Sequence, residues 1–262
     1  MHIRFDDITF GYSSEPVLDG LCLDLAGPKL IAVLGPNGVG KSTLIRCINR
    51  ILSPSKGVVS IDGTDVAEID IKSMAKIVGY VPYASSDSFP LTVADTVLMG
   101  RHPYRRWNTI EDDLLKVHEV LKSLEIEGLA MRPFNELSAG QHQKVMLARG
   151  LVQEPQILLL DEPTSNLDVR HQMEVTEILR NLAHDSGITV VMICHDLNIA
   201  AKYADELVLM FDGRIFSTGK PEKVITEGNL ETVYGVKAIV TDDDGRPHII
   251  LKDFIRAPRT ES

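Results

Sequence analysis

The chain contains 262 residues, and its 27 lysines and arginines against 37 aspartates and glutamates give a formal charge of −10 at pH 7. A hydrophobic fraction of 44% with 24% charged residues is typical of a folded domain and excludes an intrinsically disordered chain. The acidic balance opposes general binding to nucleic acid, whose phosphates attract a basic surface. The three cysteines are far apart in apolar stretches, which argues against disulfides or a zinc cluster and favours a reducing, cytoplasmic setting.

The start of the chain, from Met1 to Asp7, has no apolar run behind a basic region, so we expect no signal peptide. The uninterrupted apolar runs are short, as at 157–160, whereas a helix that spans a membrane needs about 20 apolar residues. We therefore expect a chain that does not itself cross a membrane.

Short β-branched runs alternate with helical patterns along most of the chain, which predicts an α/β fold with a parallel sheet. A strand at 3–10 and a hairpin turning at Asp62-Gly63 predict antiparallel strands near the N-terminus. Four buried strands are expected to share the main sheet: 29–34, 157–160, 189–194 and 206–211, the last turning back at Asp212-Gly213. Apolar residues at helical spacing then predict a helical subdomain with helices at 92–99, 110–124 and 140–153. The tail is expected to hold a helix near 229–234 and a hairpin turning at 243–245.

A phosphate-binding loop, Gly-x4-Gly-Lys-Ser/Thr, lies between the strand at 29–34 and a helix predicted at 41–51. Its residues are Gly35, Pro36, Asn37, Gly38, Val39, Gly40, Lys41, Ser42 and Thr43. Glycines let successive amides point at phosphate oxygens, and the helix adds about half a positive charge at its N-terminus. Lys41 is expected at the β- and γ-phosphates, Ser42 on Mg²⁺, and Thr43 at the inner phosphates. The loop predicts a nucleoside triphosphate as ligand.

Two adjacent carboxylates, Asp161 and Glu162, follow the apolar strand at 157–160. They therefore lie at the carboxyl edge of the expected sheet, where ligands of open α/β sheets bind. We expect Asp161 to hold Mg²⁺, directly or through its water shell. Glu162 is expected to face a water in line with the γ-phosphate, as general base or polarising group.

The segment Leu137-Ser138-Ala139-Gly140-Gln141, together with the motifs above, resembles the signature of the ATP-binding-cassette ATPases. The resemblance implies ATP as the nucleotide and a P-loop NTPase core that hydrolyses it. It also implies that Ser138, Ala139, Gly140 and Gln141 cap the γ-phosphate of ATP held by the other subunit of a dimer. Ser138 is a plausible N-cap for a helix at 141–153, which fits this role.

Three further positions are similar to functional positions of the same family. The segment 165–168, which ends at Asp168, resembles the loop that crosses the dimer interface. His195, after a buried strand, resembles the switch histidine that hydrogen-bonds the γ-phosphate and helps to orient the attacking water. Tyr12 resembles the aromatic residue that stacks on adenine.

Two residues depart from the family pattern. Ala139 replaces the more usual glycine in the signature, a change that the start of a helix should tolerate. Tyr83 stands where the family has a glutamine whose amide contacts Mg²⁺ or the lytic water and links the nucleotide state to the transport partner. Tyrosine has one hydroxyl and no carbonyl acceptor, so we expect a packing or water-bridged coupling role for Tyr83, with altered hydrolysis.

The resemblance also implies a division of the single 1–262 domain. Residues 1–91 and 156–220 would form a RecA-like core with an antiparallel β subdomain, 92–155 the helical signature subdomain, and 221–262 a C-terminal extension. Segments 91–103 and 230–236 are similar to importers of iron(III)-siderophores, haem and cobalamin. This implies an ATPase on the inner, cytoplasmic face of the cell membrane. It would form a homodimer beneath separate permease subunits, which a substrate-binding protein feeds with cargo.

A basic cluster is expected either at the permease, at an anionic membrane surface, or merely in a solvated loop. Its members are Arg101, His102, Arg105, Arg106 and Trp107.

Two alternative functions stay open. A non-transport ATPase of the same superfamily that acts on DNA would need a long insertion between the phosphate loop and the signature, and the interval 43–137 has no sustained heptad pattern. A regulatory module that binds ATP with little turnover is suggested by Tyr83 alone. Among importers, the cargo is expected to be an iron(III)-siderophore, with cobalamin or haem as alternatives.

Overall fold

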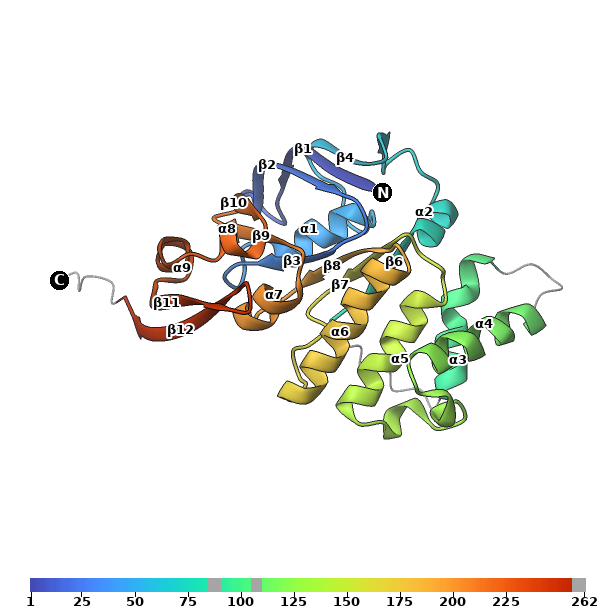
Figure 1. Ribbon diagram of the computed structural model, residues 1–262. Coiled ribbons are helices and arrows are strands. Elements are labelled where there is room, and N and C mark those ends of the chain that lie inside the picture. The colour runs from blue at the N-terminus through green and yellow to red at the C-terminus, as the bar shows by residue number, and fades with distance from the viewer. Residues whose placement is uncertain (84–90, 105–109, 256–262) are drawn as a thin grey trace.

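The structure is a computed structural model that describes residues 1–83, 91–104 and 110–255 (Figure 1). In this part of the chain the central sheet has six strands in the order β10-β9-β3-β8-β7-β6, all parallel except β10. The strands are β3 (Leu30–Leu34), β6 (Val78–Val81), β7 (Ile157–Leu160), β8 (Thr189–Ile193), β9 (Glu206–Phe211) and β10 (Arg214–Gly219). The prediction that four of these share one sheet is confirmed, and β6 extends it at one edge.

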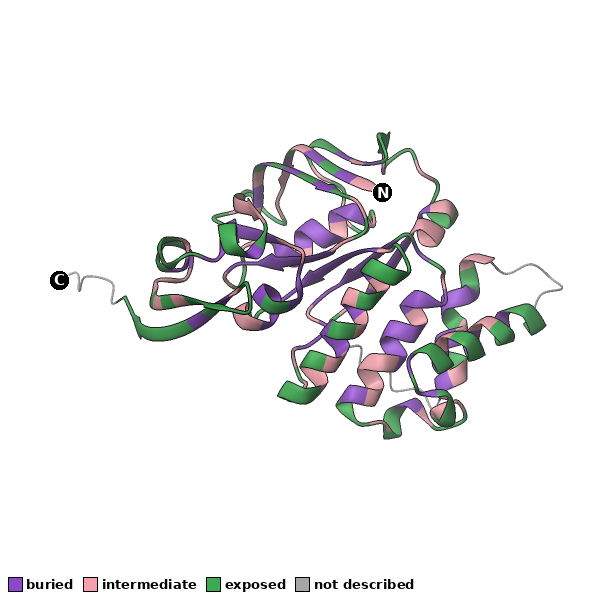
Figure 2. Ribbon diagram, viewed as in Figure 1, coloured by how far each residue is buried: buried purple, intermediate pink, exposed green. Residues whose placement is uncertain are grey.

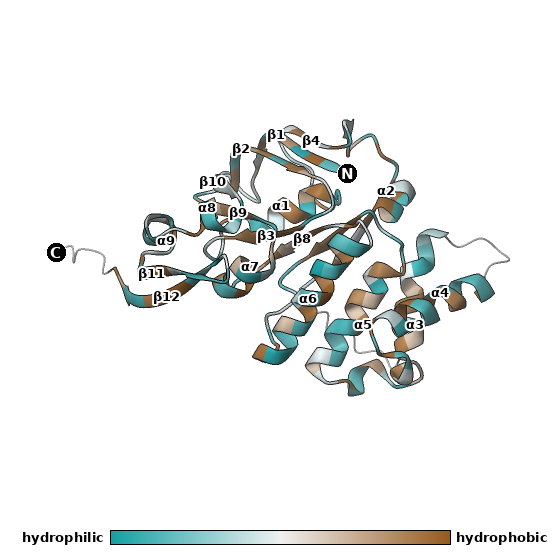
Figure 3. Ribbon diagram, in the orientation of Figure 1, coloured by the Kyte–Doolittle hydropathy of each residue, from teal (hydrophilic) through white to brown (hydrophobic). Residues whose placement is uncertain are grey.

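Side chains alternate between the two faces of the sheet along each strand. Both faces of the central sheet are buried. On β3, Leu30, Ala32 and Leu34 join one apolar core, whereas Ile31 and Val33 join the other. Figure 2 shows β3 and β8 as buried, and Figure 3 shows them as apolar. A continuous apolar strand of this kind is typical of a parallel sheet that is covered on both sides.

One face is covered by α1 (Lys41–Ile48) and by a second, antiparallel sheet in the order β2-β1-β4-β5. Its strands are β1 (His2–Phe10), β2 (Leu18–Ala26), β4 (Lys56–Ile61) and β5 (Thr64–Asp65). The expected antiparallel subdomain is therefore present. We did not predict β2, although Leu21, Leu23 and Leu25 alternate at the spacing of a strand.

The other face is covered by helices that contribute to the second apolar core. The helical subdomain contains α3 (Val93–Leu98), α4 (Ile110–Ser123) and α5 (Ala139–Leu151), close to the predicted ranges. Two helices that we did not predict, α6 (Val169–Asp185) and α7 (Leu197–Tyr203), pack beside them. A short helix, α2 (Ile71–Ile77), precedes β6.

The C-terminal extension consists of α8 (Pro221–Val224), α9 (Glu227–Tyr234) and the hairpin β11 (Val236–Asp243) with β12 (Arg246–Phe254). The predicted turn is confirmed, with positive φ at Asp244 and Gly245, and the same Asp-Gly pair turns the β9–β10 hairpin at Asp212 and Gly213. The second apolar core runs through α5, α7 and α9, so the exact subdomain boundaries stay a prediction. None of the helices described here is long and apolar enough to span a membrane.

Candidate nucleotide-binding site

The candidate site lies at the carboxyl edge of the central sheet, where four neighbouring strands end. The phosphate loop follows β3, His195 follows β8, Asp161 follows β7, and Tyr83 follows β6. Since these strands are neighbours in the order β3-β8-β7-β6, His195 lies between the phosphate loop and the two carboxylates. The sheet topology thus assembles segments that are distant in sequence.

The phosphate loop requires glycine at two positions where the chain passes close to its neighbours. Gly35 has φ 145°, and a Cβ there would lie 2.4 Å from the carbonyl oxygen of Met210. Gly40 has φ 103°, and its Cβ would lie 2.7 Å from a methyl group of Leu18. Gly40 is also the N-cap of α1, whose first turn contains no acidic residue. No acidic side chain therefore neutralises the partial positive charge at the N-terminus of α1, and this charge can attract an anion.

Lys41 is buried, with 6% of its surface exposed. Its Nζ donates hydrogen bonds to the carbonyl oxygens of Gly35, at 2.8 Å, and Pro36, at 2.9 Å. Burial lowers the pKa of Lys41 against the opposing effect of the nearby Glu162 and Asp161 carboxylates. In the free protein the Lys41 ammonium group is therefore hydrogen-bonded to the backbone of its own phosphate loop.

Asp161 is 3% exposed, and both of its carboxylate oxygens have partners. Oδ1 accepts a hydrogen bond from Ser42 Oγ at 2.8 Å. Oδ2 accepts a longer one from Tyr80 OH at 3.4 Å and lies 3.6 Å from Arg46 Nη2. Ser42 and Asp161 present oxygen atoms of the kind that Mg²⁺ binds, so the donor set fits the expected Mg²⁺.

Glu162 contacts the switch-histidine candidate, with 2.6 Å between Glu162 Oε1 and His195 Nε2. The backbone of Glu162 has φ 54°, in the left-handed region that residues other than glycine rarely adopt. Ser165 holds this conformation, because its Oγ lies 2.8 Å from the Glu162 carbonyl oxygen and 3.2 Å from Oε2. His195 is fixed just before α7, whose N-cap is Asp196.

Tyr12 lies beside the phosphate loop, as expected. Its hydroxyl is 3.5 Å from Thr43 Oγ1, and its ring meets Phe10 edge to face at 5.0 Å. The tyrosine is 63% exposed, which leaves ring surface available for stacking. A hollow of about 470 Å³ adjoins the loop, and among the residues lining it are Pro36, Asn37, Gly38, Val39, Ser13, Glu15 and Val17.

Tyr83 is 49% exposed and lines a cavity of about 240 Å³ together with Glu162. The cavity also borders the start of the signature helix at Ala139 and the segment around Leu167. Tyr83 therefore lies where it can influence water next to Glu162. Its coupling role stays a prediction.

The signature segment begins α5. The backbone N–H of Gln141 donates to Ser138 Oγ at 3.3 Å, and the N–H of Ser138 donates to Gln141 Oε1 at 3.1 Å. This reciprocal capping box confirms Ser138 as the N-cap. Ala139 is the first residue of the helix and is exposed, so the exchange for glycine is accommodated, and Gly140 is buried.

Asp168 is the N-cap of α6, and its Oδ1 accepts hydrogen bonds from the backbone N–H and the imidazole Nδ1 of His171. These two bonds, the backbone bond first, lower the pKa of Asp168. The cap fixes the end of the segment that resembles the interface-crossing loop.

The basic cluster is not what the sequence suggested. Arg101 is buried rather than solvated or facing a partner, and it forms ion pairs with Asp113 at 2.8 Å and Glu154 at 2.9 Å. It also donates to the carbonyl oxygen of Val152 at 2.8 Å. His102 is exposed, and Arg105, Arg106 and Trp107 lie outside the described residues. None of the three expectations for this cluster describes Arg101, because its acidic partners lie on other segments of the fold.

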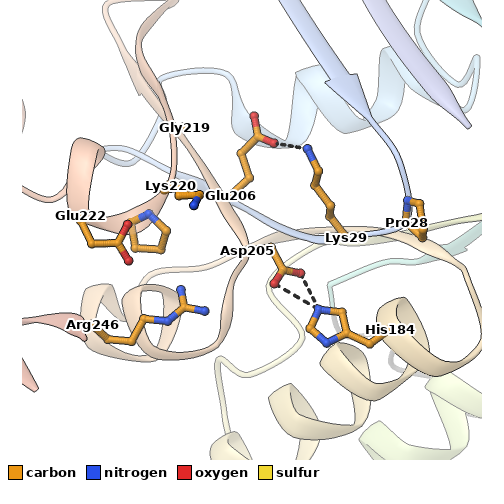
Figure 4. A pocket seen from close by; sticks show the side chains of 10 residues that line it. Pro28, Lys29, His184, Asp205, Glu206, Gly219, Lys220, Glu222 and Arg246 are labelled. Atoms are coloured by element: carbon orange, nitrogen blue, oxygen red, sulfur yellow. Dashed lines mark hydrogen bonds and ion pairs between the residues drawn. The ribbon is translucent and has the colours of Figure 1, made fainter. Parts of the chain in front are cut away.

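A hollow of about 640 Å³ lies at the opposite, amino edge of the parallel strands (Figure 4). Its charges are largely paired: Lys29 Nζ lies 3.0 Å from Glu206, and His184 Nε2 lies 2.9 Å from Asp205. Arg246 donates to the carbonyl oxygen of Ala204 at 2.7 Å. Because positive and negative side chains in this hollow pair with each other, the hollow attracts a phosphate group less strongly than the phosphate loop does.

Three residues near the site were not predicted from the sequence: Arg46, Tyr80 and His171. Arg46 follows Ser42 by one helical turn, so the spacing alone indicates that both face Asp161. His171 follows the cap residue Asp168 by three residues, the spacing of a capping box. Tyr80 reaches Asp161 only because β6 pairs with β7, which no local pattern shows.

Comparison with known proteins agrees with this geometry. A profile of the family described as ABC transporter matches residues 18–165. An uncharacterized ABC transporter ATP-binding protein of Methanocaldococcus jannaschii is 42% identical over 95% of this chain and 98% of its own length. A protein of Bacillus subtilis named as a probable siderophore transport system ATP-binding protein is 37% identical over 92% and 88%. Among solved structures, one titled as an inward-facing metal-chelate type ABC transporter superposes with a TM-score of 0.84 at 28% identity, covering 95% of this chain and 96% of that one.

Proposed function

The chain belongs to the ABC transporter family as an ATP-hydrolysing subunit of an importer, and we propose that it powers the uptake of an iron(III)-siderophore. The observation that carries the catalytic part is the 2.6 Å contact between Glu162 and His195, beside the phosphate loop and Asp161 at one edge of the sheet. The name of the Bacillus subtilis relative supports the siderophore, and segments 91–103 and 230–236 support an importer of the siderophore, haem and cobalamin group. Cobalamin and haem are the alternative cargoes.

ATP binds with its phosphates in the loop from Gly35 to Thr43. Lys41 exchanges its two carbonyl partners for β- and γ-phosphate oxygens, and the amides at the start of α1 contact the remaining oxygens. Tyr12 stacks on adenine. Ser42 and Asp161 would hold Mg²⁺, and the ion would supply positive charge that offsets the negative charge of the phosphates.

Hydrolysis requires a water that attacks the γ-phosphorus while the bond to the bridging oxygen of ADP breaks. Glu162 accepts a proton from this water or polarises it. His195, now bound to Glu162, turns to the γ-phosphate and orients the water. Ser165 keeps the Glu162 backbone in its left-handed conformation throughout.

Each complete site uses two copies of the chain. The phosphate loop of one copy holds ATP, and the N-terminus of α5 in the other copy, with Ser138, Ala139, Gly140 and Gln141, caps the γ-phosphate. Asp168 connects the two sites across the interface. The exposed start of α5 and the satisfied capping box support this proposal, because the helix end is already formed before a nucleotide arrives.

Tyr83 couples the nucleotide state to the transport partner by packing or through a bridging water. Its position at the cavity shared with Glu162 supports an effect on hydrolysis. The homodimer lies on the cytoplasmic face of the cell membrane beneath permease subunits, which a substrate-binding protein supplies with cargo.

Reconstitution tests the function and the cargo together. The chain is co-purified with its membrane permease and placed in proteoliposomes, and ATP-dependent uptake of ferric siderophores, haem and cobalamin is measured. Uptake of ferric siderophore alone supports the proposal, and uptake of cobalamin or haem alone selects the corresponding alternative. ATP binding without turnover, with and without permease, would instead identify a regulatory module. Glu162→Gln serves as the control that binds ATP without driving uptake.

A further inference from the structure

His171 is held in one orientation by the N-cap of α6. Oδ1 of Asp168 lies 2.9 Å from the backbone nitrogen of His171 and 2.8 Å from its Nδ1. A carboxylate only accepts hydrogen bonds, so Nδ1 carries the proton in this contact. The opposite edge of the imidazole, formed by Cδ2 and Nε2, therefore points away from Asp168.

That opposite edge lies against the signature. A Cβ added to Gly140 would lie 2.5 Å from Cδ2 and 2.9 Å from Nε2 of His171. Both distances are shorter than ordinary van der Waals contact, so a side chain at position 140 would displace the ring. Gly140 has no positive φ, so within this chain it is the contact with the ring, rather than the backbone conformation, that favours glycine here.

A second contact joins the same two helices one turn further along. Lys144 Nζ lies 2.6 Å from Glu174 Oε1, and the lysine side chain is only 14% exposed. Lys144 follows Gly140 by four residues on α5, and Glu174 follows His171 by three residues on α6. The two helices lie side by side (Figure 1), and these side chains connect them at the first turn and again at the second.

We propose that His171 is a positioning residue that holds the signature helix in register with Asp168. The inference rests on the proposed function, in which both segments serve the nucleotide bound by the partner subunit. One imidazole contacts both segments, so the start of α5 and the segment ending at Asp168 reach the interface as one unit. His171 itself touches neither ATP nor the reacting water.

Two substitutions of His171 separate the two contacts of the ring, and a third substitution serves as the control. His171→Ala removes both, whereas His171→Asn retains an N–H for Asp168 and lacks the edge that meets Gly140. His184→Ala is the matched control, because His184 is on the same helix, is 41% exposed against 40% for His171, and also pairs with an aspartate. Equilibrium ATP binding to the monomer, ATP-dependent dimerisation in a Glu162→Gln background, and kcat and KM are measured for each.

We expect His171→Ala to bind ATP as a monomer like the parent, while dimerisation and kcat fall by at least about tenfold, as expected when positioning is lost. His171→Asn should lie between the parent and His171→Ala, and His184→Ala should match the parent. Parent-like dimerisation and turnover in His171→Ala would overturn the inference, as would a loss of monomer ATP binding. If the parent itself neither dimerises with ATP nor hydrolyses it, the proposed function fails instead.

A double-mutant cycle tests the contact with Gly140 directly. Gly140→Ala should impair dimerisation in the parent, because the new methyl group displaces the ring. In the His171→Ala background the same change should add less than about a twofold further loss, since the clash is gone. Independent, multiplicative losses would show that glycine is needed for another reason and would overturn the proposed contact.

Discussion

Nε2 of His195 lies 2.6 Å from Oε1 of Glu162, so the two groups expected to act on the γ-phosphate and its water bind each other in the free protein. Glu162→Gln keeps the size and a carbonyl oxygen but cannot take a proton. We expect ATP affinity to stay within about threefold, hydrolysis to fall by at least about 100-fold, and the closed dimer to accumulate. Nucleotide titration, phosphate release and sedimentation measure the three quantities. Undiminished hydrolysis would remove Glu162 from its proposed role.

The exchange Tyr83→Gln introduces the residue that the family resemblance leads us to expect at this position. Because Tyr83 shares a cavity with Glu162, we expect basal and permease-stimulated hydrolysis to change while ATP binding is retained. Tyr83→Phe is the companion variant, since it keeps the ring and removes the hydroxyl. If the rate of ATP hydrolysis also changes in Tyr83→Phe, the effect is due to a water bound to the hydroxyl of Tyr83. Rates that are unchanged in Tyr83→Gln contradict the proposed influence on hydrolysis.

Arg101 is expected to contribute to stability rather than to docking. Arg101→Met leaves Asp113 buried without its ion-pair partner, which should lower the free energy of unfolding by about 3 to 5 kcal/mol. The double variant Arg101→Met/Asp113→Leu should recover much of the loss, because no buried charge remains unpaired. Denaturant unfolding measures these values, with the exposed Arg132→Met as control. Parent-like stability of Arg101→Met would show that the ion pairs contribute little.

The three thiols should differ sharply in reactivity. Cys22 is exposed, whereas burial raises the pKa of Cys47 to about 11 and that of Cys194 to about 12. At pH 8 we expect iodoacetamide to modify Cys22 alone in the native protein and all three after unfolding, as mapped by peptide mass spectrometry. Rapid modification of native Cys47 or Cys194 would contradict their burial.

The two buried thiols, Cys47 and Cys194, make the free energy of unfolding depend on pH in alkali. Their folded pKa values lie above the value of about 8.5 for an unfolded thiol, so the unfolded state loses its protons first. The favourable contribution is therefore complete below about pH 8.5 and is lost as the pH rises towards the folded pKa values. In the Cys47→Ala and Cys194→Ala variants, the free energy of unfolding should depend less on pH above about 8.5 than in the parent. At neutral pH both variants should be less stable than the parent.

Much of the site could be predicted because the chemistry is carried by short, contiguous motifs. The loop from Gly35 to Lys41 and the carboxylates at 161–162 each follow a predicted buried strand, and parallel strands end at a common edge. The cap at Ser138 could also be predicted, since capping depends only on residues within one turn. Local sequence therefore determined which side chains gather at the edge of the sheet.

The missed features depend on contacts between remote segments. Arg101 is buried because Asp113 and Glu154 approach it from α4 and from the segment after α5, and no spacing rule connects these positions. Tyr80 reaches Asp161 through the pairing of β6 with β7. The contact of His171 with Gly140 likewise needs the relative placement of two helices. Sequence patterns identify elements, but the register between elements is a property of the packed core.

The left-handed backbone of Glu162 has a practical consequence for protein engineering. A residue with a Cβ in this conformation costs about 1 to 2 kcal/mol relative to a right-handed one, and glycine avoids most of this cost. A library screened only for heat resistance would therefore enrich glycine at position 162 and discard the proposed base. Selection for a more robust variant of this ATPase must score phosphate release alongside melting temperature.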